Sequence, residues 1–247
     1  MKKIYRNQMR AEYESTEKTI LSMHDGKENK KSEMIIYHIF NGLDLIYSKF
    51  NTYNAPKSDE IPESEYIEIN YCKRGVFECI SKSGKTLYLS EGEIASNINM
   101  MQKITSNFIN GYYEGIEILI DIDEFQKNLP EMFKNIANNI KELKKVLINN
   151  ELGVILKPIK EMIHIFDELY YIDPEHDKMY AQIKVLELLH VFTAIPFDSE
   201  IRKKIYLEKK QIDKIKMIHE YLIKNLDKKI TIQQLSEKYR IGTTPLK

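Results

Sequence analysis

Alternating apolar and polar positions around an Asn-Gly pair form the clearest local pattern in the chain. A run over residues 34–40 precedes Asn41-Gly42, and a second run over residues 43–50 follows it. Asn-Gly accepts the positive φ angles of a type I′ turn, whose twist matches that of paired strands. The pattern therefore predicts a β-hairpin.

Further short apolar runs predict a series of strands after this hairpin. The runs are 66–72, 76–81, 86–90, 93–98 and 112–121, separated by Gly75, Ser83-Gly84, Glu91-Gly92 and Asn110-Gly111. About seven short strands at such regular spacing are typical of a small β-barrel or sandwich. Residues 1–31 are polar and charged instead, so we expect an exposed arm or a short helix there and ordered structure from about Glu33.

Helical spacing of apolar residues replaces the strand pattern after Asp121. The predicted helices are 130–149, 158–171 and 174–195, and each begins at or near a proline, which suits a first helical turn. In the third, an apolar stripe recurs at steps of three and four residues: Ile183, Leu186, Leu189 and His190. We expect this stripe to pack against the strands, and a dimer contact is its second possible use.

The last 36 residues predict a compact helical unit. An amphipathic helix spans residues 212–226, and Thr231-Ile232-Gln233-Gln234 follows as a capping box that starts a second helix. Gly242 supplies a flexible turn, and Thr243-Thr244-Pro245 opens a third helix. This order of elements predicts a helix-turn-helix.

Charge changes this picture, because it is unevenly distributed along a chain whose net charge is zero. Residues 209–247 carry ten Lys and Arg against four Asp and Glu, so this segment has a charge of +6 and the remainder −6. A basic C-terminal segment points to a polyanion as partner.

The C-terminal sequence resembles the AraC/XylS family of transcription regulators. Residues 230–247 are similar to the start of the family's DNA-binding domain, with Leu235-Ser236 at its small-residue position. Leu246-Lys247 resembles the beginning of the Leu-x-x-x-Phe-Lys pattern in the family's recognition helix. Upstream, residues 66–71 and the Leu-Ser-Glu-Gly-Glu sequence at 89–93 are similar to strands and a turn of its sensor barrel.

The resemblance implies an α+β protein in which a cupin-like β-barrel or sandwich is followed by helices and a partial all-α helix-turn-helix domain. The implied divisions are a polar arm (1–31), a sensor barrel (32–125), a helical, dimerising subdomain (126–195), a linker (196–211) and the partial DNA-binding domain (212–247). It implies a bacterial, cytoplasmic transcription regulator that forms a homodimer and binds DNA and a small-molecule effector. The effector would shift the sensor dimer or its arm, and so the placement of the DNA-binding domains.

The resemblance also supplies candidate DNA-binding residues. They are Lys238, Arg240, Thr243, Thr244 and Lys247. The family's domain continues beyond the point where this sequence stops, into the rest of the recognition helix and a second reading unit. We therefore expect weak DNA binding by residues 1–247 alone, and the alternative function is a sensor and dimerisation module that does not contact DNA.

Aromatic residues in the predicted strands are the candidate walls of an effector pocket. The chain has 16 tyrosines and nine phenylalanines, which suit a small, partly apolar ligand. The candidates are Tyr37, Tyr47, Tyr71, Phe77, Tyr88, Tyr112 and Tyr113, with Glu68 or Asn70 as polar anchor. The alternative for each tyrosine is ordinary packing in the core or at its rim.

The sequence argues against an enzyme. It shows no nucleophile-base pair and no phosphate-binding loop, and the acidic stretches at Asp121 and Asp173 lie where helix capping explains them. The six histidines are scattered, with none in residues 66–98, so we expect neither a metal nor a cofactor. Cys72 and Cys79 are not cross-strand partners around the predicted turn and should be free thiols. No apolar run is long enough to span a membrane, so a cytoplasmic location is expected.

Overall fold

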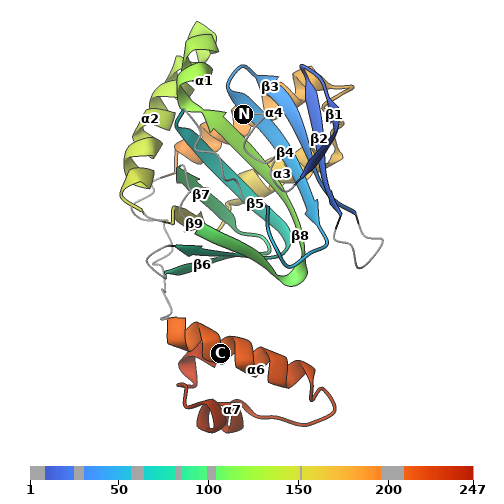
Figure 1. The fold of residues 1–247 in the computed structure, drawn as a ribbon. Helices are drawn as coiled ribbons and strands as arrows, with labels where there is room; N and C mark the ends of the chain where they lie inside the picture. The colour runs from blue at the N-terminus through green and yellow to red at the C-terminus, as the bar shows by residue number, and fades with distance from the viewer. Residues whose placement is uncertain are drawn as a thin grey trace.

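A computed structural model of the chain describes residues 9–24, 31–56, 64–81, 85–98, 104–150, 152–195 and 209–246. A large antiparallel sheet has helices packed on one side, and the C-terminal helices form a separate unit (Figure 1). The predicted combination of a sheet followed by helices is confirmed.

The described strands belong to one antiparallel sheet. They are β1 (Arg10–Glu14), β2 (Lys18–His24), β3 (Lys31–Phe40), β4 (Leu43–Phe50), β5 (Tyr66–Ser81), β6 (Thr86–Ser90), β7 (Ile94–Ile98), β8 (Ile104–Asp121) and β9 (Val154–Leu156). Their order across the sheet is β1-β2-β3-β4-β8-β5-β7-β9, and β6 pairs with β5 outside that path. The predicted hairpin around Asn41-Gly42 is confirmed as the β3–β4 pair.

The predicted helices between residues 130 and 195 are also confirmed. The helical elements are α1 (Ile122–Asn128), η2 (Glu131–Phe133), α2 (Lys134–Ile148), α3 (Lys160–Tyr171), α4 (Lys178–Thr193), α6 (Lys209–Ile223), α7 (Ile232–Tyr239) and η3 (Thr244–Leu246), with η marking a short 3₁₀ helix. The predicted linker over residues 196–211 lies almost entirely outside the described residues.

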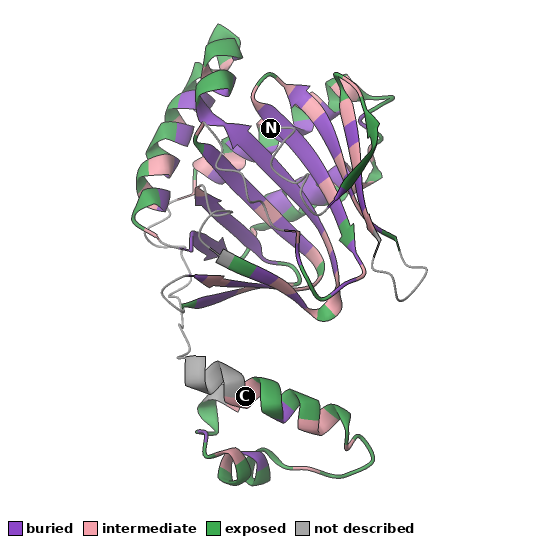
Figure 2. Cartoon of the chain, viewed as in Figure 1, coloured by how far each residue is buried: buried purple, intermediate pink, exposed green. Residues whose placement is uncertain are grey.

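Both faces of the central strands are buried, as the purple strands of Figure 2 show. Successive side chains of a strand point to opposite faces. On β4, Leu43 and Leu45 pack beneath the helices, whereas Ile46 and Phe50 belong to a second apolar cluster. We call the face that carries this second cluster the inner face. Leu21 of β2 and Ile155 of β9, near the two ends of the sheet, join the same inner cluster, which requires the sheet to curl.

Aromatic contacts fix the helices to the outer face of the sheet. The rings of Tyr71 and Phe166 of α3 stack with centroids 4.4 Å apart. The Tyr47 hydroxyl donates to the carbonyl of Leu169, also in α3, at 2.5 Å. Burying side chains of this size contributes about 1.5–3 kcal/mol each, so these rings are major anchors of the helical layer.

The N-terminal region differs from the predicted arm. Residues 10–24 form the β1–β2 hairpin, which extends the sheet beyond β3. The prediction was wrong here because β1 is exposed along its whole length, so its sequence lacks the apolar alternation of a half-buried strand. Only β2 buries residues such as Leu21 against the inner cluster.

Two predicted turns are bends within long strands. The expected turn at residues 73–75 lies inside β5, where the pairing with β8 shifts register on both sides of Gly75. Gly75 has a φ of +92°, and a Cβ there would lie 2.3 Å from the Tyr112 carbonyl oxygen. Such bulges bend a strand without ending it, so β5 and β8 each continue past a glycine that predicted a break.

The close approach of Gly42 to α1 yields a stability prediction. Gly42 and Gly92 have φ angles of +80° and +77°, so alanine at either position should cost about 1–2 kcal/mol in backbone strain. A Cβ at Gly42 would also lie 2.4 Å from the backbone nitrogen of Phe125, whereas Gly92 has nothing within 4 Å. In urea unfolding, Gly42→Ala should therefore lose at least about 1 kcal/mol more than Gly92→Ala. Equal losses would contradict the packing of this turn against α1.

Candidate functional site

Two hydrogen-bonded polar pairs lie at one level of the inner face. Strand register aligns five residues across neighbouring strands, namely His38 (β3), Asp44 (β4), Leu119 (β8), Glu68 (β5) and Asn97 (β7). His38 Nδ1 and Asp44 Oδ1 are 2.8 Å apart, and Asn97 Nδ2 donates to Glu68 Oε2 at 2.9 Å. The apolar side chain of Leu119 is in register between the two pairs. We call these five positions the polar row.

The Glu68–Asn97 pair is deeply buried and incompletely hydrogen-bonded. Glu68 is 9% exposed and Asn97 is 5% exposed. The side-chain oxygen of Asn97 has no hydrogen-bond partner among the described residues. Burial raises the pKa of Glu68 above its ordinary value, and the hydrogen bond from Asn97 opposes part of that rise. An unpaired buried polar atom costs about 1–3 kcal/mol, so this pair is a candidate site for a further partner.

Polar and aromatic groups continue along the inner face beside the row. Glu117 is buried and is in register with Asn70, whose side-chain oxygen accepts from the Tyr113 hydroxyl at 2.6 Å. The Tyr113 ring stacks on Phe108 with centroids 5.0 Å apart, and Phe77 packs on both. The row therefore lies near an aromatic cluster on the same face.

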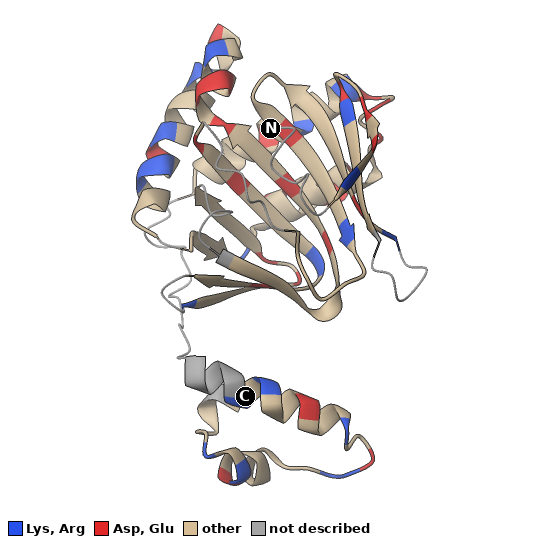
Figure 3. Ribbon diagram, in the orientation of Figure 1, with Lys and Arg blue, Asp and Glu red and all other residues tan. Residues whose placement is uncertain are grey.

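Buried charge in the described part of the chain is almost entirely negative. Its buried charged residues are Asp44, Glu68, Glu78, Glu93, Glu117, Asp121 and Lys184. Lys184 lies on α4 and pairs with Glu168 and Glu187. Asp121 accepts from the Glu124 amide as the N-cap of α1, the capping role predicted for it. Figure 3 shows acidic positions on the central strands, and His38 is the basic group described in the row.

The predicted ligand residues divide between the two faces. Phe77 belongs to the inner cluster, and Glu68, Asn70 and Tyr113 join hydrogen bonds of this same face. Tyr37, Tyr47 and Tyr71 pack with the helix-facing core instead. Tyr88 donates to Glu78, and Tyr112 donates to Glu114.

Sequence reasoning missed the partners of Glu68 in the row. Asn97, Asp44 and His38 were not among the candidates, because their alignment with Glu68 depends on the register of four strand pairs. Alternation within each strand was a usable signal for which residues share a face. It does not reveal the register, that is, which residue of one strand pairs with which residue of the next.

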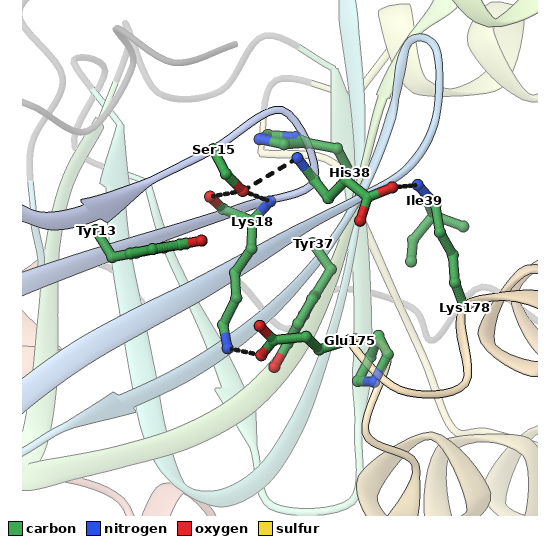
Figure 4. A pocket seen from close by; sticks show the side chains of 10 residues that line it. Tyr13, Ser15, Lys18, Tyr37, His38, Ile39, Glu175 and Lys178 are labelled. Carbon is green, nitrogen blue, oxygen red and sulfur yellow. Dashed lines mark hydrogen bonds and ion pairs between the residues drawn. The ribbon is translucent and has the colours of Figure 1, made fainter.

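A small hollow lies beside His38, between the N-terminal hairpin and the turn before α4 (Figure 4). Its volume is about 80 Å³, well below the roughly 300–1,000 Å³ of typical ligand pockets. Lys18 pairs with Glu175, and Lys178 pairs with Glu17 at 2.9 Å. These two ion pairs fasten the β1–β2 hairpin to the helical layer.

A larger hollow of about 350 Å³ lies on the surface between α3 and α4. Its lining is acidic and aromatic: Glu168, Tyr171, Ile172, Asp173, His176, Asp177 and Tyr180. Asp173 accepts from the Glu175 amide and lies 2.7 Å from His176 Nδ1. These contacts lie within the turn before α4, and the N-cap of α4, Asp177, makes no side-chain capping bond.

The C-terminal unit contains the predicted capping box. The Thr231 hydroxyl accepts from the Gln234 amide at 3.2 Å, and the Gln234 side chain accepts from the Thr231 amide at 2.9 Å. Helix α7 ends at Arg240, which adopts the left-handed conformation with a φ of +49°. The Ile241 amide then donates back to the Ser236 carbonyl, the pattern of a Schellman cap. The prediction that Gly242 makes the turn was wrong, because Arg240 adopts the left-handed conformation.

A small apolar core holds this unit together. Ile218 of α6, Leu235 of α7 and Ile241 are buried against one another. Arg240, Thr243 and Thr244 are exposed. Lys238 Nζ lies 3.3 Å from the centroid of the Tyr221 ring, and Lys247 lies outside the described residues.

An ion pair joins the C-terminal unit to the sheet. Glu78 of β5 is fully buried and pairs with Lys216 of α6 at 2.8 Å. Tyr88 and Asn107 also donate to the Glu78 carboxylate. These three donors hold its pKa below the ordinary value against the opposing effect of burial.

Other predicted features can be placed as well. Cys72 and Cys79 are free thiols, as predicted, and both are buried. Burial raises the pKa of the Cys72 thiol to about 12, so it is protonated at neutral pH. Across the described ranges, no three His, Cys, Asp or Glu side chains form a group suited to a metal ion. The described helices include none with the length and apolar character needed to cross a bilayer.

Comparisons with known proteins return structures but no sequence relatives. No profile of a protein family matches the chain, and a search of curated proteins finds no match. The chain is similar to the AraC-like transcriptional activator CuxR, with 11% identity, a TM-score of 0.29 and coverage of 92% of this chain and 78% of the other. ToxT from Vibrio cholerae O395 is 8% identical to this chain, with a TM-score of 0.34 and coverage of 83% of this chain and 72% of ToxT. A cupin 2 conserved barrel domain protein from Salinispora arenicola CNS-205 is 12% identical, with a TM-score of 0.28 and coverage of 44% of this chain and 81% of the other. TM-scores below 0.5 establish neither a shared fold nor a shared function.

The buried carboxyl of Glu68 yields a pH prediction. An acid whose pKa is raised by folding destabilises the folded state as the pH rises above its ordinary value, here 4.5. Glu68→Gln removes that loss, so the variant should gain stability over the wild type as the pH rises. A difference of one pKa unit corresponds to about 1.4 kcal/mol. Urea unfolding of both proteins at a series of pH values measures the difference.

The control for this experiment is Glu161→Gln, which changes an exposed carboxyl on α3. Other titratable groups of the inner face are present in all three proteins, so their contributions cancel. They include His38, Asp44, Tyr66, Cys72, Cys79, Tyr113, Glu117 and Asp121. If the difference in unfolding free energy between Glu68→Gln and the wild type does not change with pH, the Glu68 carboxyl is not buried in the folded protein.

Proposed function

We propose that this protein is a transcription regulator in which a cupin-like sensor domain binds a small molecule and the C-terminal unit binds DNA. The observation that carries the proposal is the geometry after residue 230. A capped helix, a left-handed turn at Arg240 and a new helical turn at Thr244 follow one another around a shared core. This arrangement, on a segment of charge +6, supports a helix-turn-helix that faces the phosphates of DNA.

The sensor role rests on the inner face of the sheet. A curled sheet with buried polar groups beside aromatic rings provides the mixed surface on which small molecules bind. The unpaired Asn97 oxygen favours a site that is completed by a ligand. We take the cytoplasm as the location, since DNA is the proposed partner.

A route between the two units is part of the proposal. Lys216 of α6 meets Glu78 of β5, and β5 also carries Glu68 on the inner face. A ligand that moves β5 would change this ion pair and so the placement of the DNA-binding unit. Coupling of this kind requires that the ligand favours one of the two arrangements.

A homodimer through α4 is the third part of the proposal. This helix buries Val185, Leu188 and Leu189 toward the rest of the chain. Its opposite side exposes Met179 and Ile183, which are 73% and 49% exposed. An apolar stripe on the outer side of a helix is a favourable surface for a second copy.

DNA binding is tested with the protein expressed from its complete reading frame. Repeated selection from a pool of random-sequence duplexes should enrich one sequence, and the affinity for it should fall as salt rises. Arg240→Gln should weaken binding and lower the slope of log affinity against log salt by about 1 if Arg240 meets a phosphate. Anisotropy titrations at several salt concentrations measure both quantities.

Lys141→Gln is the matched control, because Lys141 is an exposed cation on α2, outside the C-terminal unit. It should leave the slope unchanged. Failure to enrich any sequence would reject DNA reading and favour the alternative function of a sensor and dimerisation module. An equal loss in both variants would reject the assigned surface.

The dimer is tested by sedimentation velocity over a range of protein concentrations. The wild type should sediment as two chains, and Ile183→Glu as one, because a carboxylate would be buried in the interface without a partner. Lys141→Glu adds the same group on another helix and should remain a dimer. A wild type that sediments as one chain at every concentration would contradict a homodimer through α4.

A further inference from the structure

We propose that the Glu68–Asn97 pair of the inner face binds the protonated amino group of a small amphipathic amine. This inference rests on the proposed sensor function and names the chemical class of its ligand. Three observations support it: the unpaired acceptor, the sign of the surrounding charge, and the apolar residues beside the pair.

The unpaired acceptor requires a donor. Asn97 donates its side-chain nitrogen to Glu68 Oε2 at 2.9 Å, and its buried oxygen has no partner in the part of the chain that the structure describes. A carboxylate that accepts from one amide also keeps capacity for further donors. An ammonium group carries three donors and no acceptor, so it can bond to the Asn97 oxygen and to Glu68 together.

The surrounding charge selects a cation over a neutral donor. The buried carboxyl of Asp44 is in register with Glu68 two strands away, on the same face. The described buried residues include one lysine, Lys184, which is already paired on the helical layer. His38 is 2.8 Å from Asp44, in register on the far side of Leu119 from Glu68. A buried carboxylate without a cation is costly, and a bound ammonium would supply the missing charge.

The apolar residues beside the pair define the rest of the ligand. Leu119 is in register next to Glu68. On β7, Ala95 lies two residues before Asn97 and also faces the inner cluster. Ile46, paired with Glu117, belongs to the same cluster. These side chains favour a hydrocarbon body behind the amino group, as in an alkylamine or an arylalkylamine.

The experiment compares amines with alcohols of the same skeleton. Hexylamine and hexanol, and phenethylamine and phenethyl alcohol, are titrated into the full protein while its melting temperature and binding heat are recorded. A ligand that binds only the folded state raises the melting temperature. We expect the amines to do so and the alcohols to bind at least about tenfold more weakly, as the loss of a charged hydrogen bond implies.

Variants locate the site. Glu68→Gln keeps the shape of the side chain but removes its charge, so it should bind the amines at least about tenfold more weakly than the wild type. Glu161→Gln, an exposed carboxyl on α3, should bind as the wild type does. Asn97→Asp replaces the amide nitrogen that donates to Glu68 with a second carboxylate oxygen, and the variant should keep its preference for amines over alcohols.

Three results would overturn the proposal. Equal binding of amine and alcohol would show that charge plays no part, and equal amine binding by Glu68→Gln would place the site elsewhere. No binding of any probe would indicate that a water molecule satisfies the Asn97 oxygen.

DNA selection is measured separately, so enrichment of a sequence without amine binding rejects the ligand class alone. Amine binding without DNA enrichment rejects the regulator instead.

Discussion

Burial of both faces of the central strands is the constraint on which the rest of the structure depends. One face of β4, β5 and β8 is covered by helices, and the other is enclosed because the sheet curls until its two ends share an apolar cluster. A sheet buried on both sides needs side chains of suitable size at every position, not at alternate ones. The helices, the curl and the bulges at Gly75 all serve to enclose these strands.

The same constraint explains why the polar row is informative. Polar groups on an exposed face can bond to water, but polar groups on an enclosed face need partners within the protein. The His38–Asp44 and Glu68–Asn97 pairs satisfy most of that need. The Asn97 oxygen has no partner among the described residues, and none of their lysines or arginines pairs with Glu68. An enclosed surface with this imbalance is suited to holding something rather than to packing alone.

Local chemistry in the sequence predicted the local structure well. The Asn-Gly turn, the three helices that begin near prolines and the capping box at Thr231 each depend on a few adjacent residues. The errors came from features that adjacent residues do not determine. The exposed strand β1 has no apolar alternation to reveal it, and Gly75 bends β5 where a turn was expected. Glu68 was identified from its residue type, whereas its partners depend on how distant strands are aligned.

The Glu78–Lys216 pair links the two units in a way that limits how freely they can evolve. Glu78 is fully buried on the sheet, yet one of its three partners belongs to the C-terminal helices. The carboxylate is therefore a poor residue for a sheet that stands alone and a good one for a sheet with α6 against it. If the C-terminal unit were exchanged for a different helical unit, that unit would have to supply a cation at the position of Lys216. Domain shuffling in this protein is thereby confined to partners that carry a cation at that place.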